Sequence, residues 1–161
     1  MLTREIERRF LLERLPADLP QGTAVRQGYV AIDGDVSVRV REAAGTHTLT
    51  VKGGTGRERV EVERSIDADE FEALWRLSDG RRVAKVRSVV PLGEHWAEVD
   101  VFHGELEGLA IVEVEFPSSE AADAFEPPAW FGEEITGRPE WSNPALAVRG
   151  RPDGLRLGIG A

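Results

Sequence analysis

The sequence predicts a mainly β (α+β) protein: a closed eight-stranded antiparallel β-barrel with a charged tunnel inside and helices packed outside. Three observations favour this class. Eight stretches are typical of strands, short turns join several of them, and most alternate apolar with charged residues. Strand side chains alternate between the two faces of a sheet, so each strand receives one charged and one apolar face. Closing such a sheet into a barrel removes its unpaired edges.

The predicted strands follow one another in two long series. We expect them at residues 3–12, 23–32, 35–43, 46–52, 58–65, 82–91, 95–103 and 109–116. Asp33-Gly34 between two of them is a strong hairpin signal. Ala44-Gly45 and Gly53-Gly54-Thr55-Gly56 are also typical of turns. Short turns between successive strands indicate antiparallel pairing.

Three short helices interrupt the strands, over 68–78, 119–126 and 143–148. Asp67 is placed to cap the first helix. The apolar face of that helix carries Phe71, Leu74 and Trp75. An apolar helix face needs a sheet surface to cover, so the helices are expected on the valine-rich outer face. The charged face is then left to line the lumen.

Length and composition limit the function classes. The 161 residues predict one domain over 1–149 and a flexible tail over 150–161. A net charge of −9 argues against a partner such as duplex nucleic acid. The absence of cysteine excludes disulfides, thiolate metal sites and cysteine nucleophiles. No signal-peptide pattern and no long apolar run occur, so we expect no membrane association and a cytoplasmic location.

The charged face carries both signs. Its acidic residues are Glu5, Glu7, Glu61, Glu63, Glu98, Asp100, Glu113 and Glu115. Its basic residues are Arg9, Arg39, Arg41, Lys52, Lys85 and Arg87. Carboxylate oxygens bind hard divalent cations, and guanidinium groups bind phosphate oxygens. A polyanion and metal ions could therefore be held together in one lumen.

Other interpretations of the pattern remain open. For any single strand, a solvated face with cross-strand ion pairs is an alternative. Over many strands it is disfavoured, because Glu-x-Glu and Arg-x-Arg pairs place like charges side by side. His47, His95 and His103 show no metal-ligand spacing, and we interpret them as surface or turn residues.

The stretch Glu5-Ile6-Glu7-Arg8-Arg9 resembles the Glu-x-Glu-x-Lys signature of the CYTH superfamily, also called triphosphate tunnel metalloenzymes. The resemblance covers roughly residues 1–149, and Arg9 stands where the family has lysine. Further matches follow in the family's order: Gln27-Gly28-Tyr29, Arg39 with Arg41, Lys52, the Glu-x-Glu pairs, Lys85-Val86-Arg87 and the stretch 140–147. The resemblance implies an eight-stranded tunnel that binds triphosphates with a divalent metal.

The expected activity is metal-dependent hydrolysis of a linear triphosphate, most simply inorganic tripolyphosphate, with Mg²⁺ or Mn²⁺. The expected substrate-binding residues are Arg9, Arg39, Arg41, Lys52 and Arg87. The expected metal ligands are Glu5, Glu7, Glu61, Glu63, Asp100, Glu113 and Glu115. Lys85 is the expected general base, since neighbouring cations lower a lysine pKa, and Tyr29 is expected to assist it.

Two other functions remain open at this point. One is a nucleotide or thiamine enzyme, either an adenylate cyclase or a triphosphatase for nucleoside or thiamine triphosphates. The other is a non-catalytic protein that binds polyphosphate or nucleotides.

Overall fold

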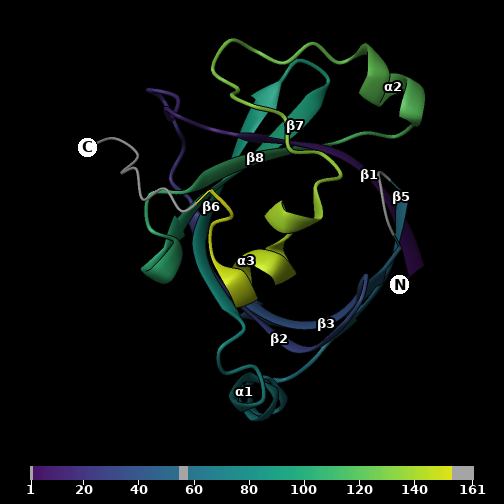
Figure 1. Ribbon diagram of the computed structural model, residues 1–161, viewed down its shortest axis with the longest axis vertical. Helices are drawn as coiled ribbons and strands as arrows, with labels where there is room; N and C mark the ends of the chain where they lie inside the picture. The colour runs from purple at the N-terminus through teal and green to yellow at the C-terminus, as the bar shows by residue number, and fades with distance from the viewer. Residues whose placement is uncertain (1, 55–57, 154–161) are drawn as a thin grey trace.

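The computed structural model describes residues 2–54 and 58–153, and its strands close into a barrel that confirms the predicted fold class (Figure 1). The strands are β1 (Leu2–Leu11), β2 (Thr23–Asp33), β3 (Val36–Ala43), β4 (Thr46–Gly53), β5 (Glu58–Ser65), β6 (Arg82–Leu92), β7 (His95–His103) and β8 (Ala110–Glu115). The helices are α1 (Ala68–Arg76), α2 (Ser119–Ala124) and α3 (Asn143–Arg149), with short 3-10 turns η1 (Gly104–Leu106) and η2 (Pro139–Trp141). Most of the predicted tail, 154–161, and part of one predicted turn, Thr55-Gly56, lie outside the described residues.

Around the barrel the strands run β1-β5-β4-β3-β2-β6-β7-β8, and every neighbouring pair is antiparallel. The Asp33-Gly34 hairpin forms as predicted, with Gly34 at φ 59°, in the left-handed region that glycine adopts without strain. The register sets charged residues opposite one another across strands. Arg87 faces Asp100, and Arg9 faces Glu113.

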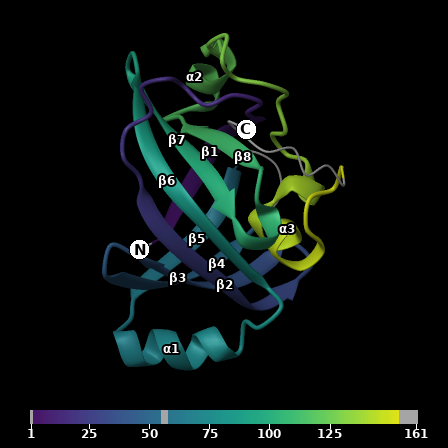
Figure 2. The same cartoon turned by 90° about the vertical axis from the view of Figure 1, so that its left-hand side faces the viewer.

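Helix α1 covers the outer face of β2, β3 and β4, as the sequence predicts (Figure 2). Asp67 and Glu70 form a capping box at its start, with Asp67 accepting from the Glu70 backbone N–H at 2.8 Å. Phe71 is fully buried, and the Arg26 guanidinium lies 5.3 Å from its ring centre. The helix ends at Arg76, two residues before the predicted end, because Leu77 and Ser78 turn back onto the Leu74 and Trp75 carbonyls.

The outer faces of β1, β7 and β8 are covered by the chain that follows β8, which includes α2. Phe10, Val99 and Val112 are buried there against Phe125 and Phe131. Helix α2 begins at the cap Ser118, whose hydroxyl accepts from the Ala121 N–H. No helix in the described part of the chain is long and apolar enough to cross a membrane.

Helix α3 lies across one end of the barrel, and in Figure 1 it is seen within the ring of strands. The inward-facing side chains become apolar at this end: Leu11, Val83, Phe102 and Ile111 each lie two residues from an inward-facing charged residue. They pack with side chains of η2 and α3, namely Trp141, Leu146 and Ala147. We call η2 and α3, residues 139–149, the plug. It leaves the charged part of the lumen as a cavity with an apolar end.

Candidate active site

The charged interior encloses a cavity of about 250 Å³. Among the described residues, its basic lining consists of Arg9, Arg39, Arg41, Lys52, Arg59 and Arg87. Its acidic lining consists of Glu5, Glu7, Glu61, Glu98, Glu113 and Glu115. Tyr29, Ser37 and the plug residues Ser142, Asn143 and Pro144 complete the wall. All eight strands contribute to this wall. β2 contributes Tyr29, β4 contributes Lys52, and each of the other strands contributes an arginine or a glutamate.

Several guanidinium nitrogens in this wall are buried and find no hydrogen-bond partner in the described part of the chain. They are Nη2 of Arg9, Nε of Arg39 and Nε of Arg59. A buried donor without a partner is destabilising, and buried charged donors are nearly always paired in native structures. Three such groups around one cavity indicate a site whose acceptor is an anionic ligand.

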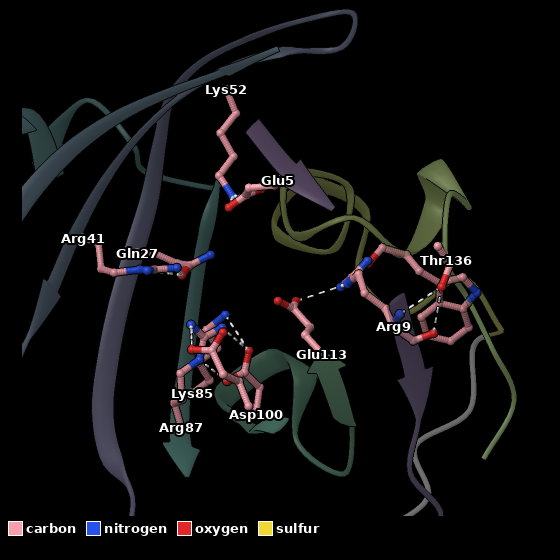
Figure 3. Close-up of polar contacts among 12 residues, drawn as sticks. Glu5, Arg9, Gln27, Arg41, Lys52, Lys85, Arg87, Asp100, Glu113 and Thr136 are labelled. Carbon is pink, nitrogen blue, oxygen red and sulfur yellow. Dashed lines mark hydrogen bonds and ion pairs between the residues drawn. The ribbon is translucent and has the colours of Figure 1, made fainter. Parts of the chain in front are cut away.

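The guanidinium of Arg9 makes two hydrogen bonds and keeps one nitrogen without a partner among the described residues (Figure 3). Nε donates to Oε1 of Glu113 at 3.1 Å, and Nη1 donates to the Trp141 carbonyl of the plug at 2.9 Å. Nη2 is the unpaired donor. The backbone of Arg9 also holds the chain before the plug, because its N–H donates to Oγ1 of Thr136 at 2.9 Å. Arg9 therefore connects the cavity to the segment that closes the barrel.

Glu5 and Glu61 form a hydrogen-bonded carboxyl pair beside Lys52. Lys52 Nζ lies 3.1 Å from Oε2 of Glu5 and 3.6 Å from Oε2 of Glu61. Burial and the hydrogen bond that its protonated carboxyl donates to Glu5 raise the pKa of Glu61 to about 7. Burial opposes ionisation of Glu5, but its bonds with Glu61 and Lys52 lower its pKa. The pair therefore shares one proton near neutral pH, because each of two close carboxyls disfavours ionisation of the other and the single Lys52 cation offsets only part of this effect.

Glu7 and Glu113 lie in the same wall and differ sharply in acidity. Burial and the charge of Glu113 raise the pKa of Glu7 to about 8. Burial also acts against the ionised form of Glu113, but Arg9, Arg87 and Lys85 outweigh it and hold its pKa far below the usual range. Glu113 is therefore ionised near neutral pH, whereas Arg9 and Lys52 only partly offset the effects that raise the pKa of Glu7.

Lys85, Asp100 and Arg87 form a buried cluster in β6 and β7 (Figure 3). Nζ of Lys85 lies 2.8 Å from Oδ2 of Asp100, and Arg87 contacts both Asp100 oxygens, at 2.7 and 2.9 Å. Burial, together with Arg87 and Arg41, lowers the pKa of Lys85 to about 8, although Asp100 opposes this shift. Arg87 also reaches Oε2 of Glu98 at 2.8 Å.

Tyr29 lies at the junction between the cavity and the apolar end. Its ring packs in the cluster that contains the plug, and it is 2% exposed. Its hydroxyl accepts from Nε2 of Gln27 at 3.1 Å, while Oε1 of Gln27 accepts from Nε and Nη2 of Arg41. Burial and the nearby Arg39 and Arg87 lower the pKa of Arg41 to about 10. The cavity therefore has an excess of positive charge on this side.

The acidic residues of the cavity could hold a divalent metal ion together with a ligand. Among residues 2–54 and 58–153, no three acidic or histidine side chains lie close enough together to form a metal cage. Mg²⁺ rarely needs one, because it is commonly bound by one or two carboxylates together with substrate phosphates and water. Glu5, Glu61 and Glu7 supply carboxyl groups for such binding, and a divalent cation beside them would favour their ionised forms. The residues therefore fit an ion that enters with a polyphosphate.

Most of the residues predicted for the site meet in this cavity, but three do not line it. Lys85 and Asp100 are buried beside Arg87 and are not among the lining residues, and the exposed Glu63 accepts from Oγ1 of Thr50 at 3.1 Å. The histidines also lie elsewhere. His47 is half-buried outside the barrel, where Nε2 lies 2.8 Å from Oε2 of Glu42 and the ring packs on Phe71.

Sequence reasoning missed several lining residues. Arg59 continues the alternation of β5, so the period-two pattern could have included it. Glu98 was placed on the charged face by that pattern, but no binding role was predicted for it. Ser37 lies two residues before Arg39 and could have been found in the same way. The plug residues Ser142 and Asn143 carry no such signal, because they follow the strands and belong to no alternating pattern.

A second cavity of about 320 Å³ adjoins the first and shares Glu7, Arg9, Ser37 and Arg59 with it. Ser142 and Pro144 of the plug also line both cavities, and the other walls of the second one are more apolar and include Ile32, Val36 and Pro139. The two cavities therefore form one polar chamber with a less polar side chamber next to the plug.

The barrel is closed, and its cavity combines unpaired guanidinium donors with carboxyls that share a proton. These features are typical of barrel proteins that bind a polyanion inside the barrel. No family model matches the chain. The chain is 43% identical over 147 residues to an inorganic triphosphatase of Nitrosomonas europaea, covering 89% of this chain and 97% of that protein. It is 40% identical over 146 residues to an inorganic triphosphatase of Acetivibrio thermocellus, with 89% and 92% covered. The chain belongs to the inorganic triphosphatase family.

Solved structures agree with this assignment. A crystal structure of an inorganic triphosphatase superposes with a TM-score of 0.69 at 41% identity, covering 89% of this chain and 97% of that one. A protein of Pyrococcus horikoshii superposes with a TM-score of 0.56 at 17% identity, over 74% of this chain and 84% of that one. The second likeness concerns the fold alone.

Proposed function

We propose that this protein is a CYTH-type triphosphate tunnel enzyme that hydrolyses inorganic tripolyphosphate with the help of Mg²⁺ or Mn²⁺. The observation that carries the proposal is the set of buried, unpaired guanidinium nitrogens around one cavity, on Arg9, Arg39 and Arg59. Membership of the inorganic triphosphatase family supports the same substrate class.

Substrate binding would use the basic side of the cavity. Guanidinium groups match phosphate oxygens in geometry and charge, so Arg9, Arg39 and Arg59 gain their missing acceptors when a triphosphate enters. Arg41, Lys52 and Arg87 add positive charge along the same wall. A linear triphosphate, with charge along its whole length, can contact all of these groups at once.

The acidic side of the cavity would hold the metal. Glu5, Glu61 and Glu7 are the proposed ligands, with Glu115 and Glu113 nearby in the wall. When bound there, the ion neutralises charge that develops on the phosphoryl oxygens and lowers the pKa of a bound water. Glu63 is not included, because it does not line the cavity.

We propose Lys85 as the general base, acting through one water molecule because its amine is fully buried and does not line the cavity. Its lowered pKa of about 8 leaves part of the amine neutral near physiological pH. Asp100 is proposed as a positioning residue in place of a metal ligand, since Lys85 and Arg87 occupy both of its oxygens. Tyr29 lines the cavity and can donate its hydroxyl proton to a phosphate or a water.

The test is phosphate release from tripolyphosphate with Mg²⁺, with Mn²⁺ and with EDTA. We expect metal-dependent release from the wild type and its loss in Glu5→Gln. The exposed Glu120 on α2 provides a matched control, because Glu120→Gln makes the same chemical change far from the cavity and should retain activity. Wild-type protein that releases no phosphate with either metal would contradict the proposal.

The side chamber favours a second candidate, a triphosphatase for nucleoside or thiamine triphosphates. Its apolar lining by Ile32, Val36 and Pro139 offers a place for a ring attached to a triphosphate in the main cavity. ATP and thiamine triphosphate should therefore be assayed beside tripolyphosphate. A higher kcat/KM for either one would favour this candidate, and formation of cyclic AMP from ATP would indicate a cyclase.

A further inference from the structure

We infer that Asn143 of the plug is a catalytic residue that holds the attacking water against the terminal phosphoryl group. This inference rests on the proposed function. It extends the site from the strands of the barrel to the plug, which contributes Ser142, Asn143 and Pro144 to the cavity wall.

The side chain of Asn143 is not needed for the local structure. The cap of α3 is Ser142, whose hydroxyl accepts from the Ala145 N–H at 3.2 Å. Oδ1 of Asn143 is buried and finds no hydrogen-bond partner among the described residues. An unpaired buried amide oxygen is unfavourable, and it is common at functional sites where a ligand or water completes the bonding.

Asn143 is held rigidly beside a phosphate-binding group. The carbonyl of Trp141, two residues earlier, accepts from Nη1 of Arg9, and Nη2 of the same guanidinium is an unpaired donor. Trp141 and Leu146 on either side of Asn143 are anchored in the apolar cluster. An anion bound by Nη2 of Arg9 would therefore lie close to the segment that carries Asn143.

The chemistry of the amide suits water rather than phosphate alone. An amide oxygen accepts hydrogen bonds, and ionised phosphate oxygens donate none, so the natural partner of Oδ1 is a water molecule. The amide NH₂ can donate to a phosphoryl oxygen at the same time. A side-chain amide that orients water is a recognised way to assist phosphoryl transfer, which depends mainly on positioning.

The experiment compares steady-state hydrolysis of tripolyphosphate by wild type, Asn143→Ala, Asn143→Asp and Val148→Gly. Val148 is an exposed residue of α3, 51% accessible, so glycine there weakens the same helix without changing the cavity. We expect Asn143→Ala to lower kcat on the order of 10- to 100-fold with little change in KM. Asn143→Asp keeps an acceptor, so it should retain more kcat than alanine while its charge raises KM.

Val148→Gly should lower the melting temperature at least as much as Asn143→Ala while it keeps kcat. Three results would overturn the inference: full kcat in Asn143→Ala, an equal loss of kcat in Val148→Gly, or an aspartate variant no better than alanine. Each of these leaves the proposed function standing as long as the wild type is active. An inactive wild type would instead refute the proposed function.

Discussion

Glu7 should destabilise the metal-free protein at alkaline pH, because its buried carboxyl must then ionise. Replacing Glu7 with glutamine should remove this loss of folding free energy. Burial and the charge of Glu113 raise its pKa from 4.5 to about 8. The folded protein therefore binds this proton more tightly than the unfolded chain does. For a group shifted in this direction, the contribution to stability is present below pH 4.5 and is lost as the pH rises towards 8.

The size of the effect follows from the shift. Each pKa unit corresponds to about 1.4 kcal/mol, so ionising Glu7 in the fold costs up to roughly 4 kcal/mol at pH 8. Water in the cavity screens part of this cost, so we expect Glu7→Gln to gain about 2 kcal/mol. In a protein of this length, that gain raises the melting temperature by about 4–8 °C. At pH 5 the gain should fall below about 1 kcal/mol.

The assay is thermal unfolding of wild type, Glu7→Gln and Glu120→Gln in EDTA at pH 5 and pH 8. Only Glu7→Gln should gain stability at pH 8, since Glu120 is an exposed residue of α2. Adding Mg²⁺ with tripolyphosphate should stabilise the wild type more than Glu7→Gln, because ligand binding to the folded state adds to its stability. The reasoning is refuted if Glu7→Gln in EDTA is no more stable than wild type at pH 8.

Three further predictions concern the buried contacts. Asp100→Asn leaves Lys85 and Arg87 without their buried counter-charge, so unfolding in denaturant should show a loss of about 3–5 kcal/mol; an unchanged midpoint would contradict the ion-pair role. Leu146→Ala opens a cavity in the plug and should cost about 2–5 kcal/mol by the same measurement, and a loss near zero would mean that the plug is not part of the core. Arg9→Lys keeps the charge, but one amine cannot bind both Glu113 and the Trp141 carbonyl. The free energy of unfolding should fall by about 1–3 kcal/mol, and KM should rise more than kcat falls. Unchanged stability would show that the contact with the plug contributes nothing.

The barrel was predictable because its alternation is local. A residue such as Glu113 faces inward because its neighbours Val112 and Val114 pack against the outer covering, and this follows from period two alone. The same rule placed Glu98 on the charged face, and it could also have placed Arg59 there. The capping box at Asp67 was equally readable, because a cap depends only on residues three positions apart.

The depth of each charged residue was less predictable, because it depends on partners distant in the chain. Asp100 and Glu98 belong to the same face of β7, yet Asp100 is 1% exposed and bound by two cations, whereas Glu98 lines the cavity. Glu63 follows Glu61 on β5 but lies outside the cavity. Alternation predicts the face of a strand, and only the stagger of the closed barrel decides which inward positions reach the ligand.

The closed end of the barrel could also have been predicted from the sequence. The signal is the position, along each strand, at which inward-facing residues change from charged to apolar. Leu11 comes after Arg9 and Phe102 after Asp100, whereas Val83 comes before Lys85. Neighbouring strands are antiparallel, so an apolar residue that follows the charges on one strand lies beside one that precedes them on the next. The lumen therefore changes from charged to apolar at one end, which requires an apolar covering such as Trp141 and Leu146.

The arginine at position 9, where the signature that the sequence resembles has lysine, gains a physical explanation from this closed end. The side chain of lysine has one nitrogen. In the Arg9 guanidinium, Nε donates to Glu113, Nη1 donates to the Trp141 carbonyl, and Nη2 has no partner among the described residues. One side chain thus contacts the acidic wall, fixes the plug and keeps a donor for a ligand. A phosphate bound to Nη2 would stiffen the same group that holds the plug. In this chain, substrate binding and closure of the barrel are therefore expected to be coupled through Arg9.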